Sequence, residues 1–236
     1  MIENLATTTD ASTTDASTTD AGTTDAGTTD ASTTDAGTTD SVPVRAIDRR
    51  RAQTRREILE AAWELCREHG LAGLSLRELG ERVGMRAPSL YSYFDSKDAI
   101  YDAMFAEGQR ALRDRYLQVT AALGDVPVRG LLRSGARTFF EFCVADPVRY
   151  QLMFQRTLPT FEPSAESYAL AVENLAILAT TLERAGVTDP RHVDLFTAVA
   201  TGLTDQQISN DPGGDRWARL LDDAVELLCD HFGLPY

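Results

Sequence analysis

The sequence from Ser75 to Phe94 reads S-L-R-E-L-G-E-R-V-G-M-R-A-P-S-L-Y-S-Y-F and has the spacing of two short helices joined by a tight turn. Ser75 and, three residues later, Glu78 form a capping box, which marks the start of the first helix. Gly84 ends that helix, and Pro88 lies where a first-turn proline is tolerated in the second. Such a pair can be ordinary packing, but it also has the layout of a helix-turn-helix, whose second helix enters the DNA major groove.

Helical spacing continues on both sides of this motif. Apolar residues recur every three or four positions from Ile58 to Cys66, and the stretch stops at Gly70. After the motif, Asp95 and Ser96 can cap a long amphipathic helix that begins near residue 97. Five more helices are predicted, at about 128–146, 147–155, 165–186, 190–209 and 216–231, and no sustained period-two alternation indicates strands.

The predicted fold class is therefore all-α. A three-helix helix-turn-helix DNA-binding head covers residues 45–98, with its motif at 75–94. Residues 99–236 are predicted to form an all-helical ligand-binding and dimerisation domain. The preceding residues, 1–44, repeat T-T-D-A-[S/G] without large apolar side chains, and this composition predicts a disordered tail. That tail is an inert repeat expansion, an acidic competitor of DNA for the head, or the result of a start codon assigned too far upstream.

The charge of the chain is divided unevenly along its length. The net charge is −13, with 36 Asp and Glu against 23 Lys and Arg. Residues 45–97 nevertheless hold eleven basic against eight acidic residues, whereas residues 98–236 hold twelve against twenty. The one basic segment is thus the one that carries the helix-turn-helix pattern, which favours DNA as its partner.

The residues around the motif resemble the TetR family of bacterial transcriptional regulators. The resemblance rests on R-R-E-I-L-E-A-A at 55–62, H-G-L at 69–71 and L-Y-S-Y-F-D-S-K-D-A-I at 90–100, and it spans about residues 53–104. It implies a sequence-specific repressor that binds a near-palindromic operator as a homodimer and is released by a small apolar ligand. The alternative is a DNA-bound adaptor that tethers a protein partner instead of sensing a ligand.

Position by position, the resemblance implies which side chains of the motif contact DNA. Arg77 lies where some family members reach a guanine, although a solvated helix-face arginine would occupy the same place. Tyr91 is expected to donate its hydroxyl to a phosphate, and Tyr93 to meet a phosphate or a thymine methyl group. Both could be core aromatics, but Leu90 and Phe94 already fill the inward face at i and i+4. The predicted contacts in the motif are Ser75, Arg77, Arg86, Ala87, Pro88, Ser89, Tyr91 and Tyr93.

Two basic features flank the motif. Lys97 is the only lysine of the chain, and it lies where the family's lysine contacts the DNA backbone, beside a helix N-terminus that also favours a phosphate. Arg49, Arg50, Arg51 and Arg55 are interpreted as a basic arm before the first helix. The arm either contacts a phosphate or the minor groove, or it is a solvated linker.

The last two predicted helices carry wide apolar stripes. A single head covers only a few base pairs, so a regulator of this kind binds as a dimer, and two subunits could merge these stripes into a four-helix bundle. The stripes could equally pack only inside one chain. The residues predicted for the interface are Leu195, Phe196, Val199, Leu203, Leu220, Leu221, Val225 and Leu228.

Bulky residues gather in the middle helices. In the family this region holds the effector cavity, although an ordinary filled core would have the same composition. The residues predicted for a ligand pocket are Phe139, Phe142, Tyr150, Met153, Phe154 and Tyr168.

No motif in the sequence predicts catalysis, a cofactor or a metal site. Gly-rich phosphate loops, H-E-x-x-H and G-x-S-x-G are absent. The three cysteines and three histidines are scattered, which fits reduced, buried thiols better than disulfides or zinc ligands. No secretory signal or bilayer-length apolar run occurs. We therefore expect a cytoplasmic DNA-binding protein, on the nucleoid when DNA-bound, and not an enzyme.

Overall fold

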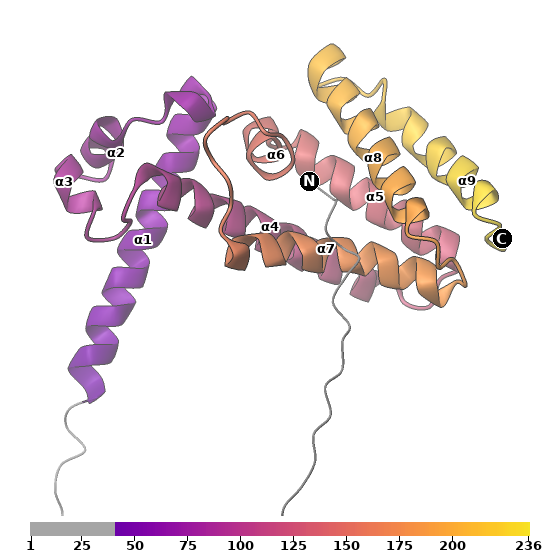
Figure 1. Cartoon of the computed structure of the whole chain (residues 1–236), viewed down its shortest axis with the longest axis horizontal. Coiled ribbons are helices and arrows are strands. Elements are labelled where there is room, and N and C mark those ends of the chain that lie inside the picture. The colour runs from indigo at the N-terminus through magenta and orange to yellow at the C-terminus, as the bar shows by residue number, and fades with distance from the viewer. Residues whose placement is uncertain (1–40) are drawn as a thin grey trace, which may run out of the picture. The chain divides into compact units, whose positions relative to one another are not determined.

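A computed structural model of the chain describes residues 41–236, with side chains from Ala46 onward, and residues 42–236 form one compact unit (Figure 1). All regular elements in this part of the chain are helices, so the predicted all-α class is confirmed. The predicted disordered tail lies outside the described residues except for residues 41–44, which belong to the first helix. Of the helices described, none is long and apolar enough to cross a bilayer.

Helix α1, Ser41–His69, corrects the prediction of a basic arm before the first helix. Arg49, Arg50, Arg51 and Arg55 all lie inside this 29-residue helix. The physical reason is local, since residues 44–69 contain neither glycine nor proline, and Pro43 falls in the first turn, where proline is tolerated. These arginines therefore lie within one continuous helix and not in an arm that precedes it.

The helix-turn-helix consists of α2, Leu76–Arg82, and the short α3, Ala87–Leu90. Ser75 caps α2 by accepting a hydrogen bond from the Glu78 amide, as predicted, but the Glu78 carboxylate lies 3.2 Å from His69 Nε2. Gly84, at φ 67°, makes the turn, because that region is costly for residues with a side chain. The second helix is shorter than predicted, since residues 91–93 form a turn.

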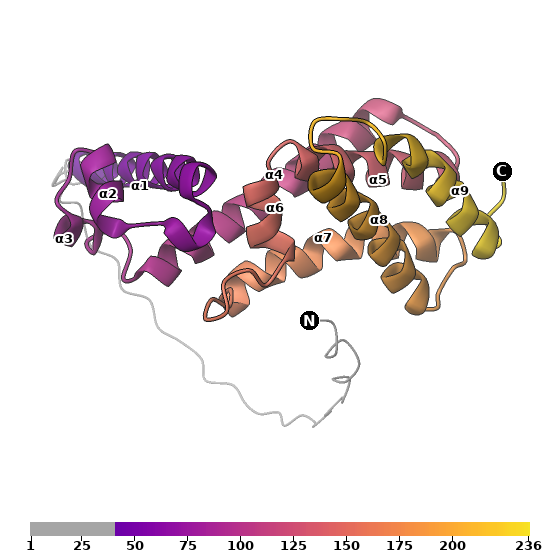
Figure 2. The ribbon, with the colours of Figure 1, turned by 90° about the horizontal axis from the view of Figure 1, so that it is seen from above.

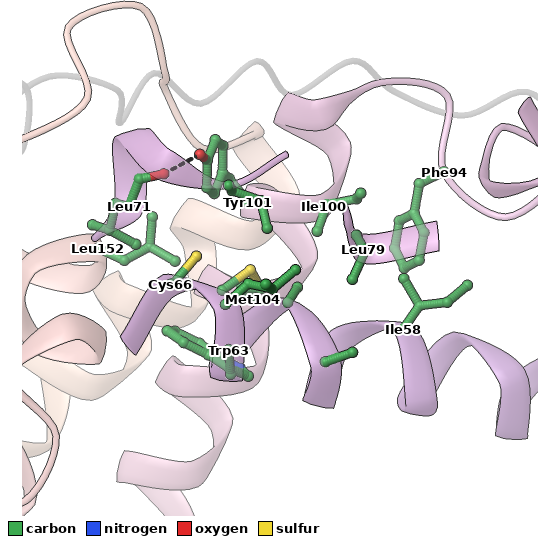
Figure 3. Packing of buried hydrophobic residues seen from close by; sticks show 14 of the residues in the cluster. Ile58, Trp63, Cys66, Leu71, Leu79, Phe94, Ile100, Tyr101, Met104 and Leu152 are labelled. Atoms are coloured by element: carbon green, nitrogen blue, oxygen red, sulfur yellow. Dashed lines mark hydrogen bonds between the residues drawn. The ribbon is translucent and has the colours of Figure 1, made fainter. Parts of the chain in front are cut away.

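The head is held together by one apolar cluster, shown in Figure 3. Ile58 of α1, Leu79 of α2 and Phe94 after α3 are at most 3% exposed. The Tyr101 hydroxyl donates to the main-chain oxygen of Leu71, which closes the short 3₁₀ turn Leu71–Gly73 onto α4. Leu152, from a helix of the body, joins the same cluster, so the core of the head continues into the rest of the chain.

The body is built on α4, Lys97–Leu123, which begins in the head. It is followed by α5, Val128–Val144; α6, Pro147–Phe154; α7, Ala165–Arg184; α8, Arg191–Asn210; and α9, Leu221–His231. These helices lie close to the predicted ranges, except that a 3₁₀ turn, Ala218–Leu220, precedes α9 and delays its start. Helix α7 runs alongside α4, and α8 and α9 lie together against α5 (Figures 1 and 2).

Candidate nucleic-acid interface

Helix α3 presents polar and aromatic groups outward and one leucine inward. Leu90 is 1% exposed, whereas Pro88 and Ser89 are exposed and Tyr91 exposes 54% of its surface. Ala87 and Tyr93 are half-buried. This division matches the one expected from the i, i+4 spacing of Leu90 and Phe94 and leaves a rigid exposed surface on α3 and the turn after it.

The close approach of α2 and α3 depends on Gly80, which the sequence analysis did not single out. A Cβ atom at this position would lie 2.8 Å from the main-chain oxygen of Met85 and 3.1 Å from the Ala87 nitrogen. The Met85 amide in turn donates to the Gly80 oxygen at 2.8 Å. Only glycine leaves room for this backbone contact, which sets the angle at which α3 leaves the turn.

Two arginines of α1 hold the turn after α3 in place. Arg55 donates to the main-chain oxygen of Tyr93, and its guanidinium lies 4.1 Å from the centre of the Phe94 ring. Arg51 donates to the main-chain oxygen of Ser92 and lies 5.4 Å from the Tyr93 ring. Both guanidinium groups thus satisfy carbonyl groups that follow a helix C-terminus, where cations are favourable. Arg51, predicted as a DNA contact, therefore also has a structural role.

Among the other basic residues predicted to contact DNA, Arg77, Arg86 and Arg50 are exposed and Lys97 is half-buried. Arg77 pairs with Glu81 at 3.2 Å, but both side chains are mostly exposed, and such pairs contribute little. Arg86 is exposed and begins α3 as its N-cap residue without a side-chain capping bond. Lys97 is the first residue of α4, with its Nζ 5.4 Å from the Tyr101 ring. Ser75 is half-buried at the start of α2, and Arg50 is exposed on α1.

The predicted dimer residues divide into three groups by burial. Phe196, Leu221, Val225 and Leu228 are at most 8% exposed and pack against α5 inside the chain. Val199 and Leu203 are half-buried against the same cluster. The first four are therefore core residues of a single chain, which corrects their interpretation as an interface. Leu195 and Leu220 keep 38% and 43% of their surface exposed, and Leu227, not predicted, keeps 71%.

The residues predicted for a ligand pocket pack against one another, and none of them lines the groove described at the end of this paragraph. Tyr150 and Met153 are buried, and Phe154 lies 5.2 Å from the Phe139 ring and 5.7 Å from the Tyr150 ring. Arg149 stacks 3.8 Å from the half-buried Phe142, and Tyr168 is half-buried. A groove of about 310 Å³ lies elsewhere, between the start of α5 and the end of α7, and is lined by Val128, Leu131, Thr181, Arg184, Ala185 and Pro235.

Contacts distant in sequence join the head to the body. Asp146 caps α6 and accepts hydrogen bonds from Arg67 of α1 at 2.7 and 3.1 Å. A Cβ atom on Gly108 of α4 would lie 2.6 Å from the sulfur of Met153, so α6 presses closely on α4. Helix α6 therefore contacts both the helix that leads out of the head and the one that supports α2 and α3.

One group of possible metal ligands lies at the surface of the head. Oxygen and nitrogen atoms of Glu68, His69 and Glu78 lie within 4.8 Å of one another. Two guanidinium nitrogens of Arg82 already bind the Glu68 carboxylate at 2.8 Å each, which holds its pKa below the ordinary value. The arrangement is therefore explained by an ion pair that ties α2 to α1.

The sequence of this chain is similar to those of known transcriptional regulators. Residues 58–104 match the model of bacterial regulatory proteins of the tetR family. A transcriptional repressor of Mycobacterium tuberculosis is 29% identical over 61% of this chain and 52% of its own length. The transcriptional activator FasR of Mycolicibacterium smegmatis is 30% identical over 52% of this chain and 55% of its own length. The chain thus spans about half the length of these curated relatives.

Solved structures share the fold at low sequence identity. The crystal structure of the regulatory protein SCO4313 has a TM-score of 0.66 and 22% identity, covering 78% of this chain and 98% of that one. FadR of Bacillus subtilis with stearoyl-CoA has a TM-score of 0.57 at 18% identity, covering 73% and 96%. AibR with isovaleryl coenzyme A and operator DNA has a TM-score of 0.57 at 17% identity, covering 77% and 100%. Residues 58–104 thus match the TetR family of bacterial regulatory proteins, and the all-helical body has the fold of solved structures that include a TetR-family regulator of Thermus thermophilus.

Proposed function

We propose that this chain is a repressor that binds a near-palindromic operator as a homodimer through α2 and α3. The observation that carries the proposal is the exposed surface of α3, where Leu90 is buried while Ser89 and Tyr91 face outward. This surface lies in the only net basic segment of an acidic chain, which favours a polyanionic partner at that place.

Roles on DNA follow from the chemistry of each exposed group. Arg77 would read a guanine, because its pairing with Glu81 is exposed and weak enough to exchange. Lys97 and Tyr91 would bind phosphates and so position the head without reading sequence. Arg51 and Arg55 would act by holding the turn that carries the two tyrosines. The other predicted contacts, Ser75, Arg49, Arg50, Arg86, Ala87, Pro88, Ser89 and Tyr93, complete the proposed surface.

The homodimer would use the outer sides of α8 and α9. Leu195 of α8, Leu220 of the turn before α9 and Leu227 of α9 expose apolar surface there, whereas Phe196 and Val225 are buried in the cluster around α5. Two copies that cover these leucines would form the four-helix arrangement predicted for this family. A dimer is also needed to read two half-sites of one operator.

A small effector would act through α6. This helix presses on α4 at Gly108, contributes Leu152 to the core of the head and is tied to α1 by the Arg67–Asp146 ion pair. A ligand that moved α6 would therefore disturb the support of α2 and α3. Two proteins of similar fold are described with acyl-CoA ligands, which supports a small-molecule effector. The second candidate, an adaptor, is favoured by the tight packing of the aromatic cluster and by the exposed Leu227.

Selection of host genomic DNA on the purified full chain, followed by sequencing of the bound fragments, tests the proposal. We expect an enriched sequence with two inverted half-sites about one helical turn apart. The variant Tyr91→Ala with Arg77→Ala serves as the matched control, because both side chains are exposed and their loss leaves the core intact. No enrichment by the folded wild type over this control would refute DNA recognition by this face.

A further inference from the structure

Asp205 of α8 is a half-buried carboxylate without a cationic partner among the described residues. It accepts hydrogen bonds only from neutral groups, the Tyr150 hydroxyl at 2.9 Å and the Gln155 side-chain amide at 2.7 Å. Both bonds end on Oδ1. The second oxygen, Oδ2, therefore has its full capacity to accept a hydrogen bond or to face a positive charge.

The basic residues near this carboxylate are engaged elsewhere. Arg191, the first residue of α8, pairs with Asp189, and no other Lys or Arg occurs on α8. Arg156, next to Gln155 in sequence, pairs with Glu162 at 2.6 Å. Arg149, next to Tyr150 on α6, stacks on Phe142 and donates to the Phe142 main-chain oxygen at 3.0 Å. A half-buried negative charge without a counter-charge is costly, so a bound cation would stabilise the Asp205 carboxylate.

Aromatic rings stand beside the same carboxylate. Tyr150, which binds Asp205, lies 5.7 Å from the Phe154 ring, and Phe154 lies 5.2 Å from the Phe139 ring. Phe154 keeps 38% of its surface exposed, so a molecule can reach this cluster without unfolding it. The faces of aromatic rings attract cations, and their apolar area binds apolar substituents.

We infer that Asp205, Tyr150, Gln155, Phe154 and Phe139 form a binding site for an organic cation that carries apolar groups. Gln155 and Tyr150 hold the carboxylate, Oδ2 faces the positive centre, and Phe154 and Phe139 cover the apolar substituents. The body as a whole supports this choice, since residues 98–236 carry twelve basic against twenty acidic residues and so attract cations and repel polyanions such as coenzyme A. This inference rests on the proposed function in that the ligand would be the effector.

The site joins elements that control the head. Tyr150 and Phe154 lie on α6, which presses on α4, whereas Asp205 lies on α8. A ligand between them would bear on both helices at once. The sequence analysis named three of these residues as pocket candidates but missed Asp205 and Gln155, because the hydrogen bonds that join them span 50 and 55 residues.

Calorimetric titration of the full chain with tetraphenylphosphonium tests the inference, with tetraphenylborate as a probe of the same shape and opposite charge. We expect one phosphonium ion per chain and an affinity that falls as salt rises. Asp205→Asn should weaken binding by at least about tenfold, because it removes the charge and keeps the shape. Asp194→Asn, an exposed acid on the same helix, loses the same charge and should leave the affinity unchanged.

Phe154→Ala provides a second variant, because its ring is partly exposed and its loss leaves the buried core intact; we expect a weakening of about threefold to tenfold. Equal phosphonium binding by wild type and Asp205→Asn, or equal binding of tetraphenylborate at the same site, would overturn the inference. So would sedimentation showing that Asp205→Asn alone dissociates a dimer, since Oδ2 would then face a second copy. Operator binding is measured separately on the wild type. A wild type that binds operator but not phosphonium refutes this inference alone, and one that binds phosphonium but no operator refutes the proposed function alone.

Discussion

The head and the body of this chain obtain their cores in different ways. In the head, the buried residues from Ile58 to Met104 lie within about fifty positions of one another, and each helix follows the last after a short turn. In the body, Leu132 of α5 packs in the same cluster as Val225 and Leu228 of α9, almost a hundred positions later. Local sequence patterns therefore predict the core of the head well, whereas the core of the body depends on which distant helices pack against one another.

The largest effect should separate the two sides of α9. Leu221 is 1% exposed, so Leu221→Asp places a charge in the core of the body and should cost about 3–5 kcal/mol or more of folding free energy. Leu227 is 71% exposed, so Leu227→Asp should leave the fold intact and weaken the proposed dimer. Thermal melts and sedimentation velocity distinguish these outcomes. A folded Leu227→Asp variant that stays fully dimeric would remove this face from the interface.

Two glycines in helices offer the next contrast. Gly80→Ala should destabilise the head by about 1–3 kcal/mol and impair DNA binding, because its Cβ would clash with backbone atoms of the turn. Gly202→Ala meets no atom within 4 Å in the single chain, and alanine favours helix, so stability should rise by up to about 1 kcal/mol. Denaturant unfolding measures both. Destabilisation by Gly202→Ala that disappears on dilution would place that glycine against a second subunit.

Variants that lose a base contact and variants that lose a phosphate contact should change DNA binding in different ways. Arg77→Ala should cost about 1–3 kcal/mol per half-site and relax preference at one position. Lys97→Ala should weaken binding to operator and scrambled DNA alike, and the slope of log K against log salt should fall by about 0.9 for each of two phosphate contacts in a dimer. Salt titrations of folded variants give the result. Wild-type affinity in both variants at every salt would show that this face does not bind DNA.

The smallest effect concerns the thiols, where head and body should behave alike. Cys66 of the head and Cys143 and Cys229 of the body are free and buried. Burial raises the pKa of Cys66 to about 11 and raises the pKa of the other two as well, so at pH 8 each group remains a thiol and not the reactive thiolate. Mass spectrometry after iodoacetamide treatment should show no modification of the native chain and three modifications after unfolding. Rapid labelling of one native cysteine would reveal local opening there.

The sequence by itself determined the helices and the motif. Ser75 at an N-cap, glycine at the turn, and Leu90 with Phe94 on one face are signals between residues at most a few positions apart, and each is present in the structure. The placement of the arginines of α1 was predicted wrongly, because the first helix was taken to begin after them, whereas residues 44–69 contain no glycine or proline that would end it there. Their positive charge was evident from the sequence. Their partners, the main-chain oxygens of Ser92 and Tyr93, were not.

Only the tertiary structure decided which side of each body helix is covered. The stripes on α8 and α9 are wide enough to pack against α5 or against a second chain, and periodicity cannot distinguish these partners. Leu220 and Leu221 were both predicted for the interface, yet Leu220 is 43% exposed and Leu221 is 1% exposed. The same holds for Asp205, whose hydrogen bonds to Tyr150 and Gln155 join α8 to the end of α6. A helix specifies its own neighbours at i+3 and i+4, but contacts across fifty residues arise only when the helices pack.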